Sequence, residues 1–430
     1  MKMSVEVKPS YTHQNMTQSG PKPKWWTDPA RQLYRRLTAA DDALKWRHRY
    51  VLPFKNLRVP VGILCGPTRG SGSSPGTLLI AGDEHRIEYM SHRFFEGETR
   101  YERLNKVPLW DLDRTLNRLQ TSADLTVVCV DKLSARLFFG ADYLAAPEWT
   151  GLILTVPEDP SKLDRSSHSL REDFRVVRRN NLTPDFTEAT ADFKLFYHTM
   201  YVPFMVKRHG KQAVVRSIDQ LRQRFYQGGL LWVRQSEQPI AGAVLQLSKQ
   251  ALRLLVVGTI NGDWAPVKSG ALAALYLFTI NHAKEQGYKL VDLGGSRPSL
   301  NDGLLQYKKK WGVRLTENRD IYYDFLIRWN SLSRPVTSFL LNTPLIFRDK
   351  SGLSALYLID QNETATQNDA WKVYRSMWVS GLQRLHLISV SGWQPGITGP
   401  PQTRLLDLTA DQALNPLSLS DMDTGSSTRE

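Results

Sequence analysis

The residues best suited to chemistry lie just before Gly312, where a lysine is expected among large apolar side chains. Asn301 or Asp302 can cap a short helix at this point. One face of the helix carries Leu304, Tyr307, Lys308 and Trp311. A cation in such surroundings costs free energy unless a ligand or a reaction uses it, and a fixed ammonium can hold an oxyanion or a phosphate. The structural alternative is that the stem of Lys308 packs beside Trp311 while its charge reaches water.

A glycine-bearing turn precedes this helix and adds further polar residues. The run Gly-Gly-Ser-Arg-Pro at 294–298 follows a predicted strand at 289–293 and forces the chain to turn. Arg297 could clamp a carboxylate or a phosphate through its planar guanidinium group. Asn301 and Asp302 are candidate substrate-binding residues, although capping a helix is the commoner role of an aspartate placed like Asp302.

Hydrophobic spacing predicts the elements that position these residues. Ser269 can cap a helix that ends at Gly287, and the connections between the strands before it are short enough for hairpins. Pro203 is expected to bend an earlier helix. Strands are expected at 174–177, 230–235, 240–248, 252–260, 289–293 and 321–325, and helices at 191–207, 214–228, 269–287 and 302–311. The predicted order is therefore β-α-α-β-β-β-α-β-α-β.

The first half of the chain has a weaker pattern and is interpreted as a mixed α/β unit. Strands are expected at 61–65, 77–81, 85–90, 125–130 and 151–156, and a helix at 109–120. The glycine-rich run at 66–76 lacks the Gly-Lys-Ser/Thr ending of a phosphate loop and is interpreted as a flexible loop. Near the other end, an apolar stripe predicts a helix that covers a core or a partner. The stripe consists of Trp371, Tyr374, Trp378 and Leu382.

Composition limits the class of protein. With 430 residues and 41% hydrophobic content, the chain can bury a large core and is long enough for two domains. Cys65 and Cys129 are too few for a disulfide framework or a four-ligand zinc site, so we expect no metal and a reducing, intracellular setting. The first thirty residues lack the apolar core of a signal peptide, and the apolar runs are shorter than the roughly 18 residues of a membrane span. These features predict a soluble, cytoplasmic protein.

The net charge of +14 is unevenly distributed along the chain. Residues 1–60 carry twelve basic and four acidic side chains, which account for over half of the positive excess. A capped helix is expected within 28–50, with leucines on one side and basic residues around the rest. It could rest on an anionic surface at the inner face of a membrane or on a polyanion, or it could pack as a solvated helix on its own protein. No other feature points to a specific nucleic acid.

The second half resembles the GNAT acyltransferase fold, first in the order of its elements. The segments FYHTMYVPFMVKRHG at 196–210 and DLGGSRPSLNDGLLQYKKKWG at 292–312 are similar to the FemAB-like branch of GNAT proteins, which is associated with cell-envelope or exopolysaccharide biosynthesis. The resemblance covers roughly residues 170–325. It implies an α+β protein with a mixed central sheet and flanking helices.

Fem-type peptidyltransferases hold two GNAT-like domains side by side, which implies a degenerate first copy in this chain. The expected parts are a disordered tail (1–24), a basic helical segment (25–58), a degenerate GNAT-like domain (59–165), a FemAB-like GNAT domain (166–330), a C-terminal helical extension (331–393) and a second disordered tail (394–430). Both tails are rich in polar residues and lack a sustained period.

The resemblance also implies a reaction, the transfer of an acyl group to an amine, and a place for its donor. In GNAT proteins two central strands part to open the donor slot, and the loop that follows holds the pyrophosphate of coenzyme A. The corresponding donor-binding candidates are Trp264, Lys268, Ser269 and Gly270. Val267 and Leu272 depart from the usual pattern of this loop, which leaves room for a donor other than an acyl-coenzyme A.

The pair Tyr307-Lys308 resembles the aromatic-lysine pair that Fem-type enzymes place against the reacting carbonyl. Both residues are therefore catalytic candidates. Lys310 would bring an anionic donor close or merely solvate the helix, and Trp311 would contact the substrate.

Further candidates stand near the end of the helix at 191–207. Tyr201 and Arg208 are candidate substrate-binding residues. His209 could accept a proton from the amine, although a histidine at a helix end often serves the helix dipole.

Two functions of different kinds remain open at this point. The first is an N-acyltransferase that takes an acyl or aminoacyl group from acetyl-coenzyme A, another acyl-coenzyme A or an aminoacyl-tRNA and passes it to an amine of an envelope or polysaccharide precursor. The second is a non-catalytic binding or scaffold protein of GNAT fold that acts at a membrane surface or polyanion. Retention of Tyr307 and Lys308 favours the first, whereas the altered loop at 263–270 favours the second.

Overall fold

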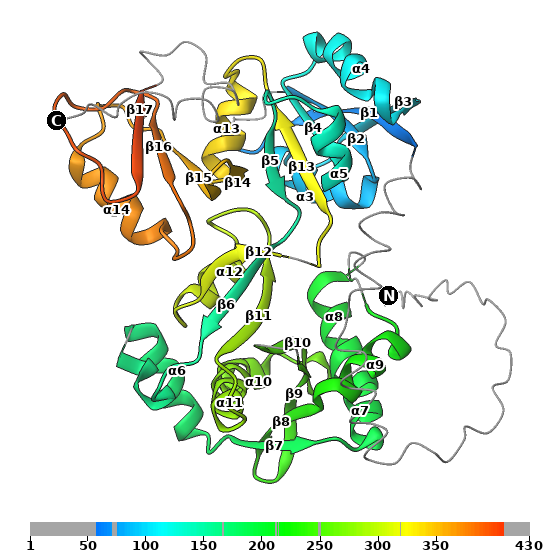
Figure 1. Cartoon of the computed structure of the whole chain (residues 1–430), viewed down its shortest axis with the longest axis vertical. Helices are drawn as coiled ribbons and strands as arrows, with labels where there is room; N and C mark the ends of the chain where they lie inside the picture. The colour runs from blue at the N-terminus through cyan, green and yellow to red at the C-terminus, as the bar shows by residue number, and fades with distance from the viewer. Residues whose placement is uncertain are drawn as a thin grey trace, which may run out of the picture. The chain divides into compact units, whose positions relative to one another are not determined.

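Two mixed sheets with flanking helices form the described part of the chain (Figure 1). The structure is a computed structural model that describes residues 57–70, 75–165, 167–210, 213, 215–247, 251–318 and 320–407. The predicted tail at 1–24, the basic helix expected within 28–50 and residues 408–430 lie outside these ranges. The sheets and helices confirm the predicted α+β class.

The ten-stranded sheet combines strands from both ends of the described chain. Its order is β17-β16-β15-β14-β5-β13-β4-β2-β1-β3. The strands are β1 (Arg58–Pro67), β2 (Pro75–Gly82), β3 (Arg100–Pro108), β4 (Leu125–Asp131), β5 (Leu144–Pro147), β13 (Tyr323–Arg328), β14 (Ile346–Asp349), β15 (Gly352–Ile359), β16 (Leu385–Ser389) and β17 (Thr403–Asp407). The helices along these segments are α3 (Glu84–Phe94), α4 (Leu112–Leu119), α5 (Lys132–Phe138), α13 (Arg334–Asn342) and α14 (Gln367–Met377). The strands expected at 61–65, 77–81 and 125–130 and most of the helix expected at 109–120 are present.

The strand expected at 85–90 is wrong, because this segment belongs to helix α3. Asp83 caps α3 by accepting a hydrogen bond from the backbone N–H of His85 at 3.0 Å. Ile87, Met90 and Phe94 are buried at helical spacing. The short alternation of polar and apolar residues imitates a strand, but the buried residues Ile87, Met90 and Phe94 recur every three to four positions, which is the spacing of a helix.

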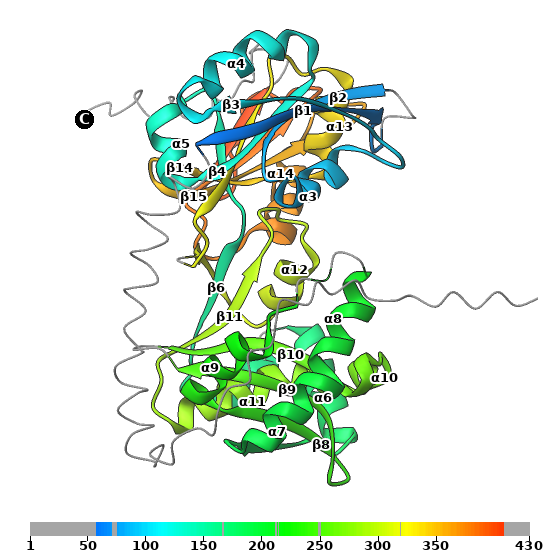
Figure 2. The same cartoon turned by 90° about the vertical axis from the view of Figure 1, so that its right-hand side faces the viewer.

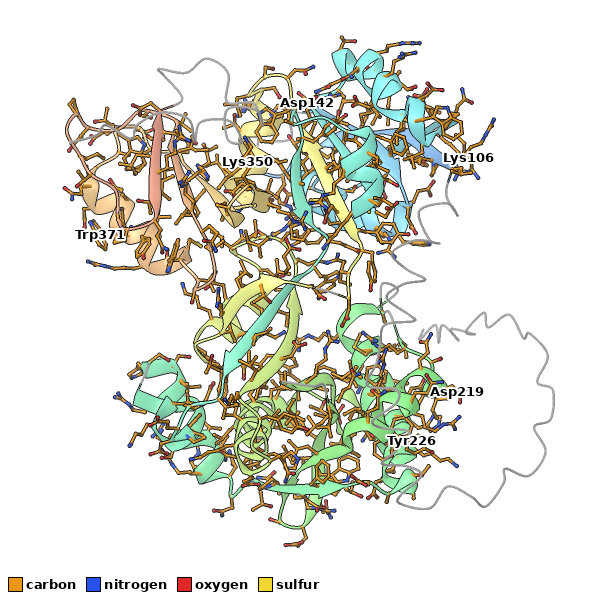
Figure 3. The ribbon with its side chains drawn as sticks, in the orientation of Figure 1. Lys106, Asp142, Asp219, Tyr226, Lys350 and Trp371 are labelled. Atoms are coloured by element: carbon orange, nitrogen blue, oxygen red, sulfur yellow. The ribbon has the colours of Figure 1, made fainter. Side chains whose placement is uncertain are left out.

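The C-terminal part also differs from the expected helical extension and tail. Strands β14, β15 and β16 lie within 331–393, and β17 lies within the expected tail at 394–430. All five residues of β16 are buried, so this strand shows no alternation from which it could be predicted. Of the apolar stripe, Trp371 and Tyr374 lie on a helix, α14, whereas Trp378 follows its last residue and Leu382 lies beyond it (Figure 3). Tyr374 stacks on Trp378 with ring centroids 5.1 Å apart, and both pack against the core.

The seven-stranded sheet carries the elements that resemble the GNAT fold. Its order is β12-β6-β11-β10-β9-β8-β7. The strands are β6 (Thr150–Thr155), β7 (Thr183–Thr187), β8 (Leu230–Gln235), β9 (Gln238–Leu247), β10 (Ala251–Thr259), β11 (Leu290–Ser296) and β12 (Arg314–Glu317). The helices are α6 (His168–Arg179), α7 (Thr190–Phe196), α8 (Val202–His209), α9 (Ile218–Gly228), α10 (Ala265–Lys268), α11 (Ala271–Glu285) and α12 (Gly303–Lys309). From β7 to α12 the elements follow the predicted order, except that the first predicted helix is divided into α7 and α8 and the short helix α10 is additional.

Two expected strands are placed differently, and so is the division between the halves. Residues 174–177 lie in α6, and the first strand is β7. The strand expected at 321–325 is observed as β13, but it pairs with β4 and β5 of the ten-stranded sheet. Strand β6, from the first half, pairs with β11 and β12 instead. The expected boundary after residue 165 therefore does not separate the two sheets, and descent of the first sheet from a GNAT-like copy stays a prediction.

Helices cover both faces of the seven-stranded sheet, because successive side chains of β8 join two different hydrophobic clusters. Leu231 and Val233 join the core on which α6 and α11 pack, whereas Leu230 and Trp232 join the cluster formed with α7, α8 and α9. Helix α11 is apolar nearly all round, which suits a helix enclosed in a core. No helix within the described ranges is both long enough and apolar enough to cross a membrane.

The bend between α7 and α8 is a π-helical turn at Tyr197–Tyr201, with Pro203 in the first turn of α8. Gly258 of β10 packs against this turn, where an added Cβ would lie 2.7 Å from the backbone of Met200. Only a glycine permits this approach. The predicted helix is interrupted near Pro203, but the interruption is the π-helical turn, which Pro203 follows.

An ion network joins the two sheets. Arg348 of β14 donates hydrogen bonds to Glu317 of β12 and to Asp324 of β13. Lys132 of α5 adds a further ion pair with Glu317 at 3.2 Å. Asp324 is only 2% exposed, so its carboxylate depends on this arginine for compensation.

Candidate active site

The central feature of the candidate site is the place where β10 and β11 part. The two strands pair in parallel over three residues, from Ala251 with Leu290 to Arg253 with Asp292. Beyond that point β10 continues along β9 and β11 continues along β6, and each strand has a register irregularity there. The strands thus separate beyond this pair, as expected for a GNAT-like sheet, and we call the place of separation the notch.

Two glycines shape the β11 side of the notch. Gly294 has a φ of +77°, a conformation that glycine adopts without strain. A Cβ on Gly295 would lie 2.5 Å from the carbonyl oxygen of Thr150 on β6. Gly294 is thus required by its backbone conformation, and Gly295 is required because β6 leaves no room for a side chain.

Lys308 of α12 directs its ammonium group into this notch. Its Nζ donates a hydrogen bond to the carbonyl oxygen of Gly295 at 2.9 Å and lies 3.7 Å from the position of a Cβ on Gly294. Figures 1 and 2 both show α12 beside β11. Lys308 is 5% exposed, which excludes the alternative in which its charge reaches open water.

Burial lowers the pKa of the Lys308 ammonium to about 8, while Asp292 and Asp302 oppose this shift. The group is therefore a cation that loses its proton more readily than an ordinary lysine. Such a group can donate hydrogen bonds to developing negative charge.

Tyr307 and Trp311 form an aromatic wall with Tyr276 of α11. Ring centroids are 5.4 Å apart for Tyr276 with Tyr307 and 5.4 Å for Tyr276 with Trp311. Burial raises the pKa of the Tyr307 phenol, so it stays neutral. Trp311 is fully buried and packs on Phe174 of α6, which makes it a core residue.

The lysines next to Lys308 have protein partners. Lys310 pairs with Asp173 of α6, and its Nζ lies 4.2 Å from the centroid of the Tyr307 ring. Lys309 donates a hydrogen bond to the carbonyl oxygen of Ser376 at 2.7 Å. Both side chains anchor α12 to its neighbours.

The structure encloses Arg297 between side chains of the first half of the chain. Its guanidinium carbon lies 4.7 Å from the ring centroid of Tyr89 and 4.2 Å from that of Trp149. Glu148 lies 3.8 Å away and is itself paired with Arg86. Burial lowers the pKa of Arg297, with Glu148 opposing. Because Arg297 contacts two aromatic rings and Glu148, its contacts support a role in joining the sheets near the notch.

Asn301 and Asp302 likewise have structural partners. Asn301 accepts a hydrogen bond from Arg93 at 2.6 Å and donates one to the carbonyl oxygen of Asn342 at 2.9 Å. Asp302 caps α12 by accepting hydrogen bonds from the N–H groups of Leu304 and Leu305 at 3.0 and 3.1 Å. The helix-capping interpretation of Asp302 is therefore the one observed.

Helix α6 packs against one side of the turn at Ser269 and Gly270, just before α11. The helix begins after Gly270, whose φ is +92°, and not at Ser269 as expected. A Cβ on Gly270 would lie 3.0 Å from Val176 of α6. Ser269 accepts a hydrogen bond on its carbonyl oxygen from Asn180 at 3.1 Å, and Lys268 is exposed. Helix α6 thus occupies the side of the turn that Ser269 and Gly270 face.

A pocket of about 400 Å³ lies at the end of β10, between α8 and this turn. Its lining consists of Phe204, Lys207, Arg208, Gly262, Asp263 and Trp264. Arg208 lies 5.4 Å from the ring centroid of Trp264, which is 52% exposed. The structure therefore brings together Arg208 and Trp264, which were predicted separately.

The other two candidates on the earlier helix have different positions. Tyr201 is buried, and its hydroxyl accepts a hydrogen bond from the N–H of Arg216 at 3.1 Å. His209 ends α8, and its side chain lies outside the described ones.

Residues that sequence reasoning missed surround the notch. Asp292 pairs with Arg253, and Glu148 and Trp149 surround Arg297. In the sequence, only Asp292 could have been noticed, because it lies two positions before Gly294. Glu148 and Trp149 are about 150 positions from Arg297, so no local pattern connects them. Within the described ranges no group of three or more His, Cys, Asp or Glu side chains could hold a metal ion.

Comparisons with known proteins give a fold likeness only. No protein-family model matches the chain, and no curated protein matches it in sequence. The solved structure of FemX is 13% identical with a TM-score of 0.35, covering 68% of this chain and 95% of that one. The L-PGS structure from Bacillus licheniformis is 12% identical with a TM-score of 0.32, covering 66% and 85%. A probable N-acyltransferase from Enterococcus faecalis V583 is 10% identical with a TM-score of 0.28, covering 77% and 76%. Because these scores are low, the fold assignment rests on strand order and on the parting of β10 and β11.

Proposed function

We propose that this chain is a GNAT-like N-acyltransferase, which moves an acyl or aminoacyl group from an activated donor to an amine of a cell-envelope or polysaccharide precursor. One observation carries the proposal: the ammonium of Lys308 is buried where β10 and β11 part and is bonded to Gly295. A buried ammonium costs free energy, and stabilisation of an oxyanion would explain its place. The proposed setting is the cytoplasm, with peripheral membrane contact through residues 25–58.

The chemistry requires one bond to form and one to break. The amine nitrogen attacks the donor carbonyl, a C–N bond forms, and the C–S or C–O bond to the leaving group breaks. The amine loses a proton and the leaving thiol or hydroxyl gains one. Among the described residues Lys308 donates a single hydrogen bond, to Gly295, so two N–H donors remain for the oxyanion. Tyr307 would wall the reacting group from water.

The pocket beside α8 is the proposed place for the non-reacting part of the donor. Trp264 offers an exposed aromatic face, and Lys207 and Arg208 offer cations, although Asp263 pairs with Lys207 at 2.7 Å. This choice is supported by the cover that α6 places over Ser269 and Gly270. The proposed donors are an acyl-coenzyme A or a related activated ester such as an aminoacyl-tRNA.

The test compares wild type, Lys308→Met and the matched control Lys309→Met. Each protein is offered acetyl-coenzyme A or an aminoacyl-tRNA mixture with a panel of amino sugars and peptides, and products are measured by mass spectrometry. Removing an oxyanion donor lowers rates by about 10²–10³-fold, so Lys308→Met should lose at least about 100-fold in activity. Lys309→Met should stay within a few-fold of wild type, because Lys309 bonds only Ser376 among the described residues.

Equal rates for wild type and Lys308→Met would overturn the proposed role of the ammonium. Failure of every donor to bind or react would favour the non-catalytic alternative, a GNAT-fold binding or scaffold protein. Thermal shifts with each donor separate absence of binding from absence of transfer.

A further inference from the structure

Asp292 stands at the base of the notch, at the last residue pair that joins β10 to β11. Its register partner is Arg253, and the Arg253 Nε lies 3.1 Å from the Asp292 carboxylate. Arg253 also bonds the carboxylate of Asp320. This ion pair therefore closes the parallel pairing at the point where the strands begin to part.

The same carboxylate holds the glycine turn. Its other oxygen, Oδ1, accepts a hydrogen bond from the N–H of Gly294 at 2.8 Å. Gly294 turns the chain with its φ of +77°, and the next carbonyl, that of Gly295, accepts the hydrogen bond from Lys308. A continuous series of contacts thus runs from Arg253 through Asp292 and the turn to the ammonium.

Two carboxylates act on Lys308, and a third charge, that of Arg253, pairs with one of them. Asp292 lies on β11, Asp302 caps α12, and Arg253 of β10 lies behind Asp292. Both carboxylates favour the protonated form of Lys308, whereas burial disfavours it. Asp302 accepts hydrogen bonds from the N–H groups at the start of α12. Asp292, in contrast, contacts both the glycine turn and the neighbouring strand β10.

We propose that Asp292 is a positioning residue of this site: tied to Arg253, it fixes the Gly294–Gly295 turn, whose Gly295 carbonyl holds the Lys308 ammonium. The catalytic meaning of this assignment rests on the proposed function. The arrangement itself can be tested without any substrate.

The experiment follows the titration of Lys308 by NMR in the full chain, with lysine labelled by ¹³C at Cε. The Lys308 signal is assigned by its disappearance in Lys308→Met. Asp292→Asn keeps an oxygen that can accept from Gly294 but removes the negative charge. Its Lys308 midpoint should fall by about one pH unit, because the Asp292 charge opposes the lowering of the Lys308 pKa by burial. Asp320→Asn is the matched control, because it removes the other acid on Arg253 and should leave the midpoint unchanged.

An unchanged midpoint in Asp292→Asn would overturn the proposal, and so would an equal fall in Asp320→Asn. The transfer assay separates this outcome from failure of the proposed function. If the midpoint falls but transfer does not depend on Lys308, the positioning role stands and the acyltransferase proposal fails. If transfer depends on Lys308 but Asp292→Asn changes neither the midpoint nor the pH profile of the rate, the positioning role is wrong.

Discussion

Replacing Lys308 by Met should stabilise the protein at neutral pH, although it removes the proposed catalytic group. Lys308 is 5% exposed, and burial lowers its pKa from the usual 10.5 to about 8. A lysine with a lower pKa in the folded state binds its proton more weakly there, so its charge opposes folding. Since one pKa unit is worth about 1.4 kcal/mol, this shift corresponds to about 3 kcal/mol.

The net effect is smaller because the variant also loses a hydrogen bond. The bond from Lys308 to Gly295 contributes about 1 kcal/mol, which leaves a gain of about 2 kcal/mol for Lys308→Met. The gain should be complete below pH 8, where the ammonium is charged in both states. As the pH rises from 8 towards 10.5, folded Lys308 loses its proton first, the penalty disappears and the difference between the proteins shrinks.

Urea unfolding followed by circular dichroism measures this difference from neutral pH to about pH 10. Lys194→Met, at an exposed position on α7, is the control and should follow wild type throughout. A Lys308→Met variant that is less stable than wild type at neutral pH, or a difference that does not vary with pH, would refute the reasoning. The surroundings would then stabilise the ammonium, and its burial would need no functional explanation.

Two further substitutions test the framework around the site. Arg348→Ala should destabilise the protein by about 3–5 kcal/mol in urea unfolding, because it leaves the buried Asp324 without its main partner. Arg103→Ala, which removes an exposed ion pair with Glu84, is the control and should cost much less than Arg348→Ala. Gly258→Ala should lower the free energy of unfolding by about 1–3 kcal/mol, since its Cβ would lie 2.7 Å from the backbone of Met200. Gly303→Ala, with nothing within 4 Å of its Cβ, should cause no such loss, and equal effects of the two would show that the close approach is unimportant.

The sequence by itself determined the elements that depend on neighbours a few positions away. The cap of α12 at Asp302, the stop of α11 at Gly287 and the hairpins between β8, β9 and β10 were predicted and are observed. Caps, turns and amphipathic spacing act over one or two turns of chain, so their signals can be detected locally. Burial of Lys308 could be expected for the same reason, because its helix neighbours Tyr307 and Trp311 are aromatic.

Only the tertiary structure decided which distant segments meet at the site. Strand β6 lies between β11 and β12, β13 returns to the other sheet, and Arg297 is enclosed by Tyr89 and Trp149. The ion pair of Arg253 with Asp292 and the packing of α6 against Gly270 are also contacts between distant segments. These contacts join residues separated by tens to hundreds of positions and leave no local period. They are set by which packing buries the most apolar surface while satisfying each buried charge, a property of the whole fold.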